Sequence, residues 1–259
     1  MKTYEKSIDI YGDGQSSVTY VDHLGSDLTI VNAARVSFGH EKDELDSRDR
    51  RLINYLIKHR HTSTLEHNVI TFKFVVPLFV RSQHHRHRTW SYNEISRRYT
   101  DKDLRFYEPR DFRTQHKINR QASNENDLIN PVISRSRTAS SSPERLDASK
   151  LIKMHHRDSL DLFDDLLAAG VCREQARGVL PQNLYTEYYG TCNLNNLVKF
   201  VDLRLHEGAQ WEIQQVAKAT LEIATDLFPI TVNAYRNNKH GEPQTDIRPQ
   251  DGRSSENHR

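Results

Sequence analysis

The segment that most constrains the fold is the apolar run at residues 69–76 (VITFKFVV). Its residues are mostly β-branched or aromatic, which favours a β-strand. Pro77 ends the run, because proline cannot donate a backbone hydrogen bond to a neighbouring strand. Residues 78–80 then begin a predicted helix. The sequence therefore predicts a strand that leads directly into a helix carrying a segment rich in arginine and histidine.

Helical patterns occur at several other places. Residues 47–60 carry an apolar stripe at helical spacing. Ser142-Pro143-Glu144 combines a cap, a proline in the first turn and an acid near the positive end of the helix dipole. We therefore expect a helix from there to about Ala169, ended by Gly170. The other predicted helices are residues 173–180, 193–206 and 209–227.

The remaining segments are expected to be less regular. Residues 7–36 alternate short apolar runs with turn residues, which indicates strands or a short helix. Residues 114–142 are polar and weakly periodic, so we expect a long mobile loop. Residues 237–259 are nearly free of apolar side chains and are expected to form a disordered tail. The sequence thus predicts one domain at residues 1–236.

Composition narrows the class of protein. The chain has 259 residues and a formal net charge of +2, so its overall charge does not predict a nucleic-acid partner. Its two cysteines, Cys172 and Cys192, form no disulfide framework, which favours a reducing cytoplasm. The N-terminus lacks the apolar stretch of a signal peptide, and no run approaches the roughly 18 apolar residues of a membrane span. We therefore expect a soluble cytoplasmic protein with no membrane partner.

The segment at residues 83–99 carries the chemistry. Arg86, Arg88 and Arg98 offer planar donor forks that suit phosphate oxygens. Neutral amides and hydroxyls between them suit the edges of a base and a sugar, and Glu94 adds one carboxylate. None of the ten glycines forms a G-x-G-x-x-G or a P-loop. The mixture is typical of a nucleotide pocket in which side-chain cations replace backbone amides.

Three other interpretations apply to the same residues. Residues 81–99 suit a solvated basic face, or a patch that binds nucleic acid. Lysine is absent from residues 74–101, and aromatic residues are interleaved with the cations, which counts against both. The third interpretation is a metal site, since His84 and His87 share a helix face with His85 between them. No carboxylate or cysteine stands at supporting spacing, so we expect no metal.

Several motifs in order resemble one enzyme family. Arg86-His87-Arg88, seven further residues and then Ser96 match the signature of the flavin-dependent thymidylate synthases (the ThyX family). The resemblance covers roughly residues 7–236. The other similar stretches are residues 32–38, residues 61–67, residues 177–186, Asn193, Leu203-Arg204 and residues 209–213.

The resemblance implies a role for individual residues. Arg204 would be the catalytic residue, lying against the uracil ring and stabilising its ionised form. His61 would lie beside the flavin, where folate stacks. The residues implied to bind dUMP are Gln83, Arg86, Glu94, Ile95, Ser96, Arg97, Arg98, Tyr99, Arg177 and Arg204. Those implied to bind FAD are Ser63, Arg86, His87, Arg88, Glu94, Asn193, Asn195 and Lys199.

The implied reaction converts dUMP to dTMP. The carbon would come from 5,10-methylenetetrahydrofolate and the hydride from FAD reduced by NADPH. The mixed pattern of helices and strands, together with the resemblance, predicts an α/β (α+β) fold with helices packed on a mostly antiparallel sheet, assembled as a homotetramer. Glu94–Arg98 would reach the dUMP of a neighbouring subunit, because a continuous helix would spread Arg86 and Arg98 along about 18 Å. A turn after Arg88 is the alternative, and it would put Arg86 and Glu94–Arg98 of one chain into the same pocket.

Two positions depart from the family pattern. The position two after Asn193 is often arginine, but it is Asn195 here, and Lys199 stands where asparagine or histidine is common. We expect Lys199 to supply the cation that Asn195 lacks. The other thymidylate synthase chemistry uses a cysteine nucleophile, and nothing near Cys192 in the sequence marks an activated thiol.

Overall fold

Strand β3 (Val69–Pro77) lies at the centre of a five-stranded sheet with the order β1-β2-β3-β9-β4. In the computed structural model, residues 4–136 and 144–239 are described. All four strand pairings of the sheet are antiparallel. The other strands are β1 (Ser7–Asp9), β2 (Ser17–Leu24), β4 (Ser91–Glu94) and β9 (Tyr185–Asn193). The strand predicted at residues 69–76 is therefore confirmed.

Alternate side chains of β3 build the core. Ile70, Phe72 and Phe74 are completely buried, as expected for one face of a strand. Phe72 pairs with Gly190 on β9. A Cβ atom at Gly190 would lie 2.8 Å from Cε2 of Phe74, so glycine lets the Phe74 ring lie flat against β9. This close packing fixes the register of the two central strands.

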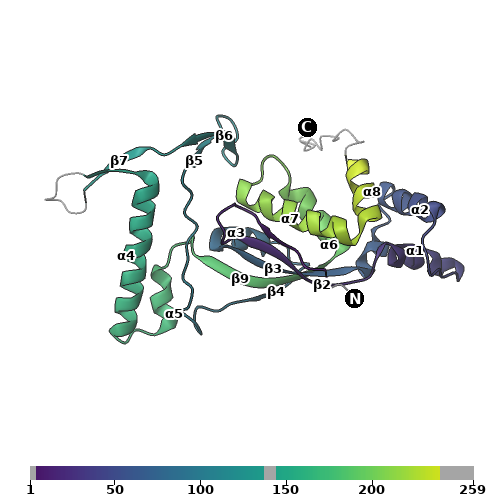
Figure 1. Ribbon diagram of the computed structural model, residues 1–259, viewed down its shortest axis with the longest axis horizontal. Helices are drawn as coiled ribbons and strands as arrows, with labels where there is room; N and C mark the ends of the chain where they lie inside the picture. The colour runs from purple at the N-terminus through teal and green to yellow at the C-terminus, as the bar shows by residue number, and fades with distance from the viewer. Residues whose placement is uncertain (1–3, 137–143, 240–259) are drawn as a thin grey trace, which may run out of the picture.

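Helices cover the sheet, as Figure 1 shows. Their apolar side chains pack with those of β2, β3 and β9 into one continuous core. The predicted helix–sheet architecture is therefore confirmed. The helices of this part are α1 (Asp27–Arg35), α2 (Ser47–Lys58), α3 (Leu78–His84), α6 (Leu194–Arg204), α7 (Trp211–Leu227) and α8 (Pro229–Lys239), with the 3-10 turns η1 (Val36–Phe38) and η2 (Thr62–His67).

Helix α8 was not predicted, because its N-terminal cap comes from a distant part of the chain. The carboxylate of Asp27 accepts hydrogen bonds from the backbone N–H groups of Ile230 and Thr231, at 2.9 and 3.0 Å, and from the Thr231 hydroxyl at 2.6 Å. Asp27 is buried. A carboxylate in this place accepts hydrogen bonds from the free N–H groups of the first turn, and its negative charge interacts favourably with the positive end of the helix dipole. The residues just before α8 therefore give no sign of this cap, because Asp27 is far away in the sequence.

A second, smaller part lies at one end of the sheet (Figure 1). It contains α4 (Ala148–Ala168), α5 (Arg173–Ala176) and the turn η3 (Arg177–Val179). Phe163 of α4 packs against Phe106, Ala176 and Leu184 in a small separate core. The predicted helix start at residues 142–144 was wrong. Residues 144–147 form strand β8, and the helix begins at Ala148.

The predicted loop at residues 114–142 contains regular structure. Two antiparallel strand pairs, β5–β6 and β7–β8, begin, lie or end within or beside this segment. The strands are β5 (Phe112–Gln115), β6 (Ser123–Ile129), β7 (Val132–Arg135) and β8 (Glu144–Asp147). Residues 137–143 lie outside the described residues. The sequence did not predict these strands. Most of β6 and all of β7 are exposed to solvent, so they lack the alternation of apolar and polar residues that marks a half-buried sheet.

The predicted boundary at residue 237 is also too early. Helix α8 continues through Lys239. The rest of the predicted tail, residues 240–259, lies outside the described residues. None of the helices in the described part of the chain has the length and apolar character needed to cross a bilayer.

Candidate active site

Arg204, at the end of α6, is held by two uncharged acceptors. Its Nε donates a hydrogen bond of 3.0 Å to Nε2 of His87, and its terminal nitrogen donates one of 3.1 Å to the backbone oxygen of Gln83. Burial lowers the pKa of Arg204, although a guanidinium remains charged at neutral pH. Among residues 4–136 and 144–239, no carboxylate lies within ion-pair distance of it. Its positive charge is therefore fixed in place and not neutralised.

His87 is suited to accept that hydrogen bond. Burial, and then the nearby charge of Arg204, lower the pKa of His87 to about 4. The imidazole is therefore neutral at neutral pH, with Nε2 unprotonated and the proton on Nδ1. A neutral ring adds no charge beside the guanidinium. His87 thus orients Arg204 without reducing its positive potential.

Two neighbouring arginines are open to solvent. Helix α3 ends at His84, and residues 85–90 form turns that carry Arg86 and Arg88 to the surface. Within the described ranges, neither guanidinium has a hydrogen-bond or ion-pair partner. The segment is therefore not one continuous helix, and a turn follows Arg88, as in the alternative interpretation. The turns instead present two free cations on the surface near Arg204.

His84 is part of the core. Its ring is completely buried, and its Nδ1 shares a hydrogen bond of 2.8 Å with the Tyr188 hydroxyl. The ring also contacts Phe74, Trp90 and Phe200. Burial holds the pKa of His84 well below its ordinary value, so the ring is neutral. No group of three metal-ligating side chains occurs among the described residues.

Gln83 is linked to residues that sequence reasoning did not select. Its side-chain Nε2 donates to Oε1 of Gln210, and Nε2 of Gln210 donates to Oε2 of Glu212 at 3.0 Å. The other oxygen of Glu212 accepts from Arg113 at 2.5 Å and from the Tyr107 hydroxyl at 3.2 Å. Glu212 is only 3% exposed. A carboxylate on the buried face of an amphipathic helix is the signal that could have identified this group.

The second half of the Arg-rich segment lies away from Arg204. Strand β4 pairs Ser91 with Thr191 and Glu94 with Tyr188, so the chain runs back along the edge of the sheet. From Ser91 to Ser96 an extended chain covers about 16 Å at about 3.3 Å per residue. Arg86 and Ser96 therefore lie at opposite ends of β4, although a turn does follow Arg88.

Glu94 and Arg97 contact residues of α3 and β9. Glu94 lies 3.1 Å from Nε of Arg81 and accepts a hydrogen bond of 2.6 Å from Thr186. The side chain of Arg97 donates to backbone oxygens of Lys102 and Tyr185 at 2.7 and 3.3 Å.

Arg98 and Arg177 come together at Glu174. Arg98 lies 3.9 Å from the Glu174 carboxylate, and Nε of Arg177 donates to the Glu174 backbone oxygen at 3.4 Å. Ile95 and Tyr99 are exposed, and Ser96 is half-buried. The structure thus places Arg98 and Arg177 together at Glu174, and separately brings Gln83 and His87 together with Arg204.

Of the residues implied to hold the flavin, Asn193 and Asn195 lie at the start of α6, whereas Glu94 lies on β4 against Arg81 and Thr186. Asn193 is the N-cap of this helix, because its side-chain oxygen accepts from the backbone N–H of Asn196 at 2.9 Å. This confirms the capping role that its position indicated. Asn195 is buried and donates to Glu66 of η2 at 2.8 Å. Ser63 and Lys199 are exposed.

His61 precedes η2 on the same side of the protein. Its exposed ring stacks on Tyr55, with centroids 6.0 Å apart and an interplanar angle of 17°. A flat, solvent-accessible pair of rings is a surface on which a further planar ring can stack.

The two cysteines differ in environment. Cys192 lies in the core at 3% exposure, and burial raises the pKa of its thiol well above the ordinary value. A buried neutral thiol is a poor nucleophile. Cys172 is exposed at the start of α5.

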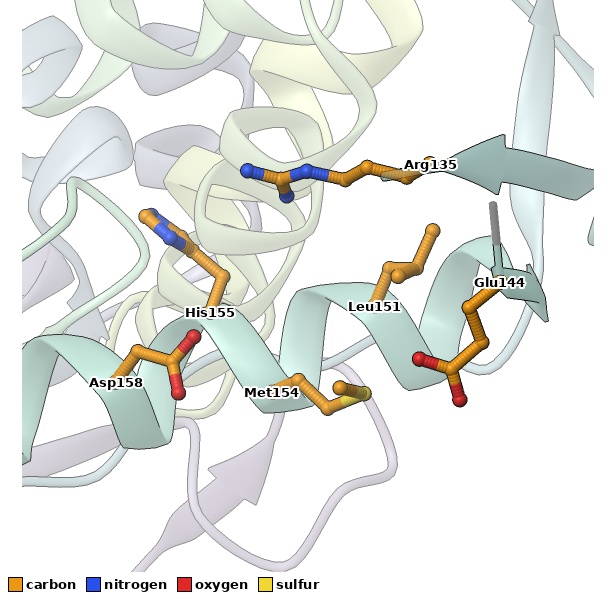
Figure 2. A pocket seen from close by; sticks show the side chains of 6 residues that line it. All are labelled: Arg135, Glu144, Leu151, Met154, His155 and Asp158. Atoms are coloured by element: carbon orange, nitrogen blue, oxygen red, sulfur yellow. The ribbon is translucent and has the colours of Figure 1, made fainter. Parts of the chain in front are cut away.

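Two cavities lie elsewhere. One of about 260 Å³ separates β7 and β8 from α4 and is lined by Arg135, Glu144, Leu151, Met154, His155 and Asp158 (Figure 2). The other, of about 530 Å³, lies among α1, α2 and α8. No residue implied to bind dUMP or FAD lines either cavity. The arginines instead lie on open faces of the chain.

Known proteins match the chain over most of its length. The family model described as "Thymidylate synthase complementing protein" matches residues 19–230. A flavin-dependent thymidylate synthase of Thermus thermophilus is 43% identical over 84% of this chain and 74% of its own length. A flavin-dependent thymidylate synthase of Thermotoga neapolitana is 41% identical over 84% of this chain and 89% of its own length.

A solved structure matches as well. A UMP/dUMP methylase, PolB from Streptomyces cacaoi, bound with 5-Br dUMP, has a TM-score of 0.70 and 33% identity, covering 86% of this chain and 95% of the other. The family model and the relatives each cover more than two thirds of the chain. On these matches, the chain belongs to the family of flavin-dependent thymidylate synthases.

Proposed function

We propose that this chain converts dUMP to dTMP, with 5,10-methylenetetrahydrofolate as carbon donor and NADPH-reduced FAD as hydride source. The observation that carries the proposal is the environment of Arg204. A partly buried guanidinium held by two neutral acceptors keeps its charge for a ligand. The family and the UMP/dUMP methylase that this chain is similar to support the same chemistry.

Arg204 would stabilise negative charge on uracil. Attachment of a carbon at C5 requires electron density to build on the ring, at N3 and O4. A fixed cation with little water around it stabilises such charge far more than solvent does, because its orientation costs nothing during the reaction. His87 and the Gln83 carbonyl hold the guanidinium in place. No cysteine is needed for this activation, which agrees with the buried Cys192.

The residues near α6 fit a cofactor that carries a diphosphate. Arg86, Arg88 and Lys199 are exposed cations on this side of the molecule, and guanidinium forks bind phosphate oxygens well. They would hold FAD with Ser63, Asn193 and Asn195, and His61 would receive the folate ring by stacking. When bound, the flavin supplies the hydride of the reaction.

A second group of residues, Ser96, Arg98, Tyr99 and Arg177, would bind the phosphate side of dUMP from a neighbouring subunit. They lie at the end of β4 remote from Arg86. The open faces that carry both groups of residues support a homotetramer in which two chains complete each site. A soluble cytoplasmic protein is the setting we propose.

Flavin content tests this function at low cost. The purified protein is expected to be yellow, and its flavin absorption should bleach when NADPH is added without oxygen. Arg88→Ala should lower the flavin bound per chain, because one phosphate contact is lost. Arg157→Ala, an exposed arginine of α4, is the matched control and should leave flavin content unchanged. A colourless protein whose binding to nucleic acid falls steeply with salt would instead favour the nucleic-acid alternative.

A further inference from the structure

A chain of polar contacts connects strand β5 to the end of α3. In order, it runs from Arg113 through Glu212 and Gln210 to Gln83. We refer to these four residues as the relay. Arg113 is itself fixed by a 3.0 Å hydrogen bond from its Nε to Ser123 of β6, and its guanidinium lies 4.8 Å from the centre of the Trp211 ring. The relay therefore ends in the β5–β6 hairpin.

The charge on Glu212 sets the direction of every hydrogen bond in the relay. A carboxylate only accepts, so Gln210 must turn its NH₂ group toward Glu212 and its oxygen toward Gln83. Gln83 must then turn its own NH₂ group toward Gln210. The side-chain oxygen of Gln83 is the only acceptor atom of that side chain, and it has no hydrogen-bond partner among the described residues.

We propose that Gln210 and Glu212 are positioning residues that orient the Gln83 amide so that its oxygen accepts a hydrogen bond from the nucleotide. This inference rests on the proposed function, since Gln83 is a proposed dUMP ligand. Uncharged donors on dUMP are the ring N3–H and the 3′-hydroxyl. The backbone oxygen of the same Gln83 accepts a hydrogen bond from Arg204, so this residue joins the substrate contact to the catalytic arginine.

The relay also gives the β5–β6 hairpin a function. Glu212 is buried, and a buried carboxylate without a positive partner is costly. Arg113 supplies that partner from β5, the strand that leads into the segment predicted as a loop. The hairpin thus supplies the positive partner of the Glu212 carboxylate, and a carboxylate at this position determines which atom of Gln83 faces the substrate.

Glu212→Gln should reverse the relay. The donors Arg113 and Tyr107 would keep the amide oxygen of residue 212 facing them, so its NH₂ group would face Gln210. Gln210 and then Gln83 would have to turn round, which would present an NH₂ group to the donor on the nucleotide. We expect the KM for dUMP to rise about tenfold, the loss of one hydrogen bond, with kcat at saturating dUMP nearly unchanged.

The exchange of both residues separates positioning from stability. In the double variant Gln210→Glu, Glu212→Gln, the new carboxylate accepts from both neighbours, so the Gln83 amide returns to its original orientation. The direct ion pair of Arg113 is lost in the single and the double variant alike. We therefore expect the exchange to restore the KM for dUMP to within about threefold of the original value. A purely structural role of Glu212 requires the double variant to be as impaired as the single one, and that result would overturn the proposal.

Two further measurements complete the test. Flavin content and the midpoint of thermal unfolding report whether each variant is folded. Binding of 3′-deoxy-dUMP and of N3-methyl-dUMP identifies the donor, because the analogue that lacks it should bind the original protein and Glu212→Gln equally. If Glu212→Gln weakens binding of both analogues as much as that of dUMP, Gln83 does not accept from either donor and the inference is wrong. Failure of the unaltered protein to make dTMP would instead contradict the proposed function itself.

Discussion

Arg204→Ala is expected to lower kcat for dTMP formation by about a hundredfold or more while FAD stays bound. This is the usual scale for removing a fixed donor that stabilises charge in a transition state. No other described cation is hydrogen-bonded to both His87 and Gln83, so no neighbour can replace the lost guanidinium. Turnover at saturating dUMP, together with flavin absorption, measures the two parts of the expectation.

Two comparisons make this result specific. Arg204→Lys keeps a charge but loses the fork that contacts His87 and Gln83, so we expect intermediate activity. Arg157→Ala on α4 should retain full activity. Near-normal turnover in Arg204→Ala would remove Arg204 from the catalytic role.

Mixing two inactive variants is expected to restore about a quarter of the original activity. Arg98→Ala and Arg204→Ala proteins are unfolded together in equal amounts and reassembled. If each site takes Arg204 from one chain and Arg98 from another, half of the sites receive each intact residue, and about one in four receives both. Either variant reassembled alone should stay inactive.

The arrangement of β4 underlies this expectation. Arg98 lies beside Glu174 at one end of the strand, whereas Arg204 contacts His87 before its other end. One nucleotide on one chain would have to span both. Mixed tetramers that form but recover no activity would show that each chain builds its own site.

The sequence predicted the central elements well, because their signals are local. Local apolar periodicity and boundary residues such as Pro77, Gly208 and Pro229 predicted one strand and three helices. These are the strand at residues 69–76 and the helices at 47–60, 193–206 and 209–227. The structure has each of them within a few residues of the predicted bounds. The matched motifs also selected Arg204, which the structure places against His87 and Gln83; its catalytic role stays a prediction.

The features that escaped prediction depend on distant partners. Helix α8 needs Asp27, about two hundred residues earlier, to cap it. The strand pairs β5–β6 and β7–β8 bury no continuous apolar face, so their register comes from backbone pairing. Glu212 appeared only as one residue of a matched motif. Its role became visible once Arg113 and Gln210 were placed beside it.

The most direct test of the central claim follows the transferred carbon. The protein is given dUMP, NADPH and methylenetetrahydrofolate that carries an isotopic label in its methylene group, and the product is analysed by mass spectrometry. The proposed function requires dTMP with one labelled methyl carbon, formed only when NADPH and bound FAD are both present. Formation of dTMP without NADPH by flavin-free protein, or no dTMP from protein saturated with FAD, would contradict it.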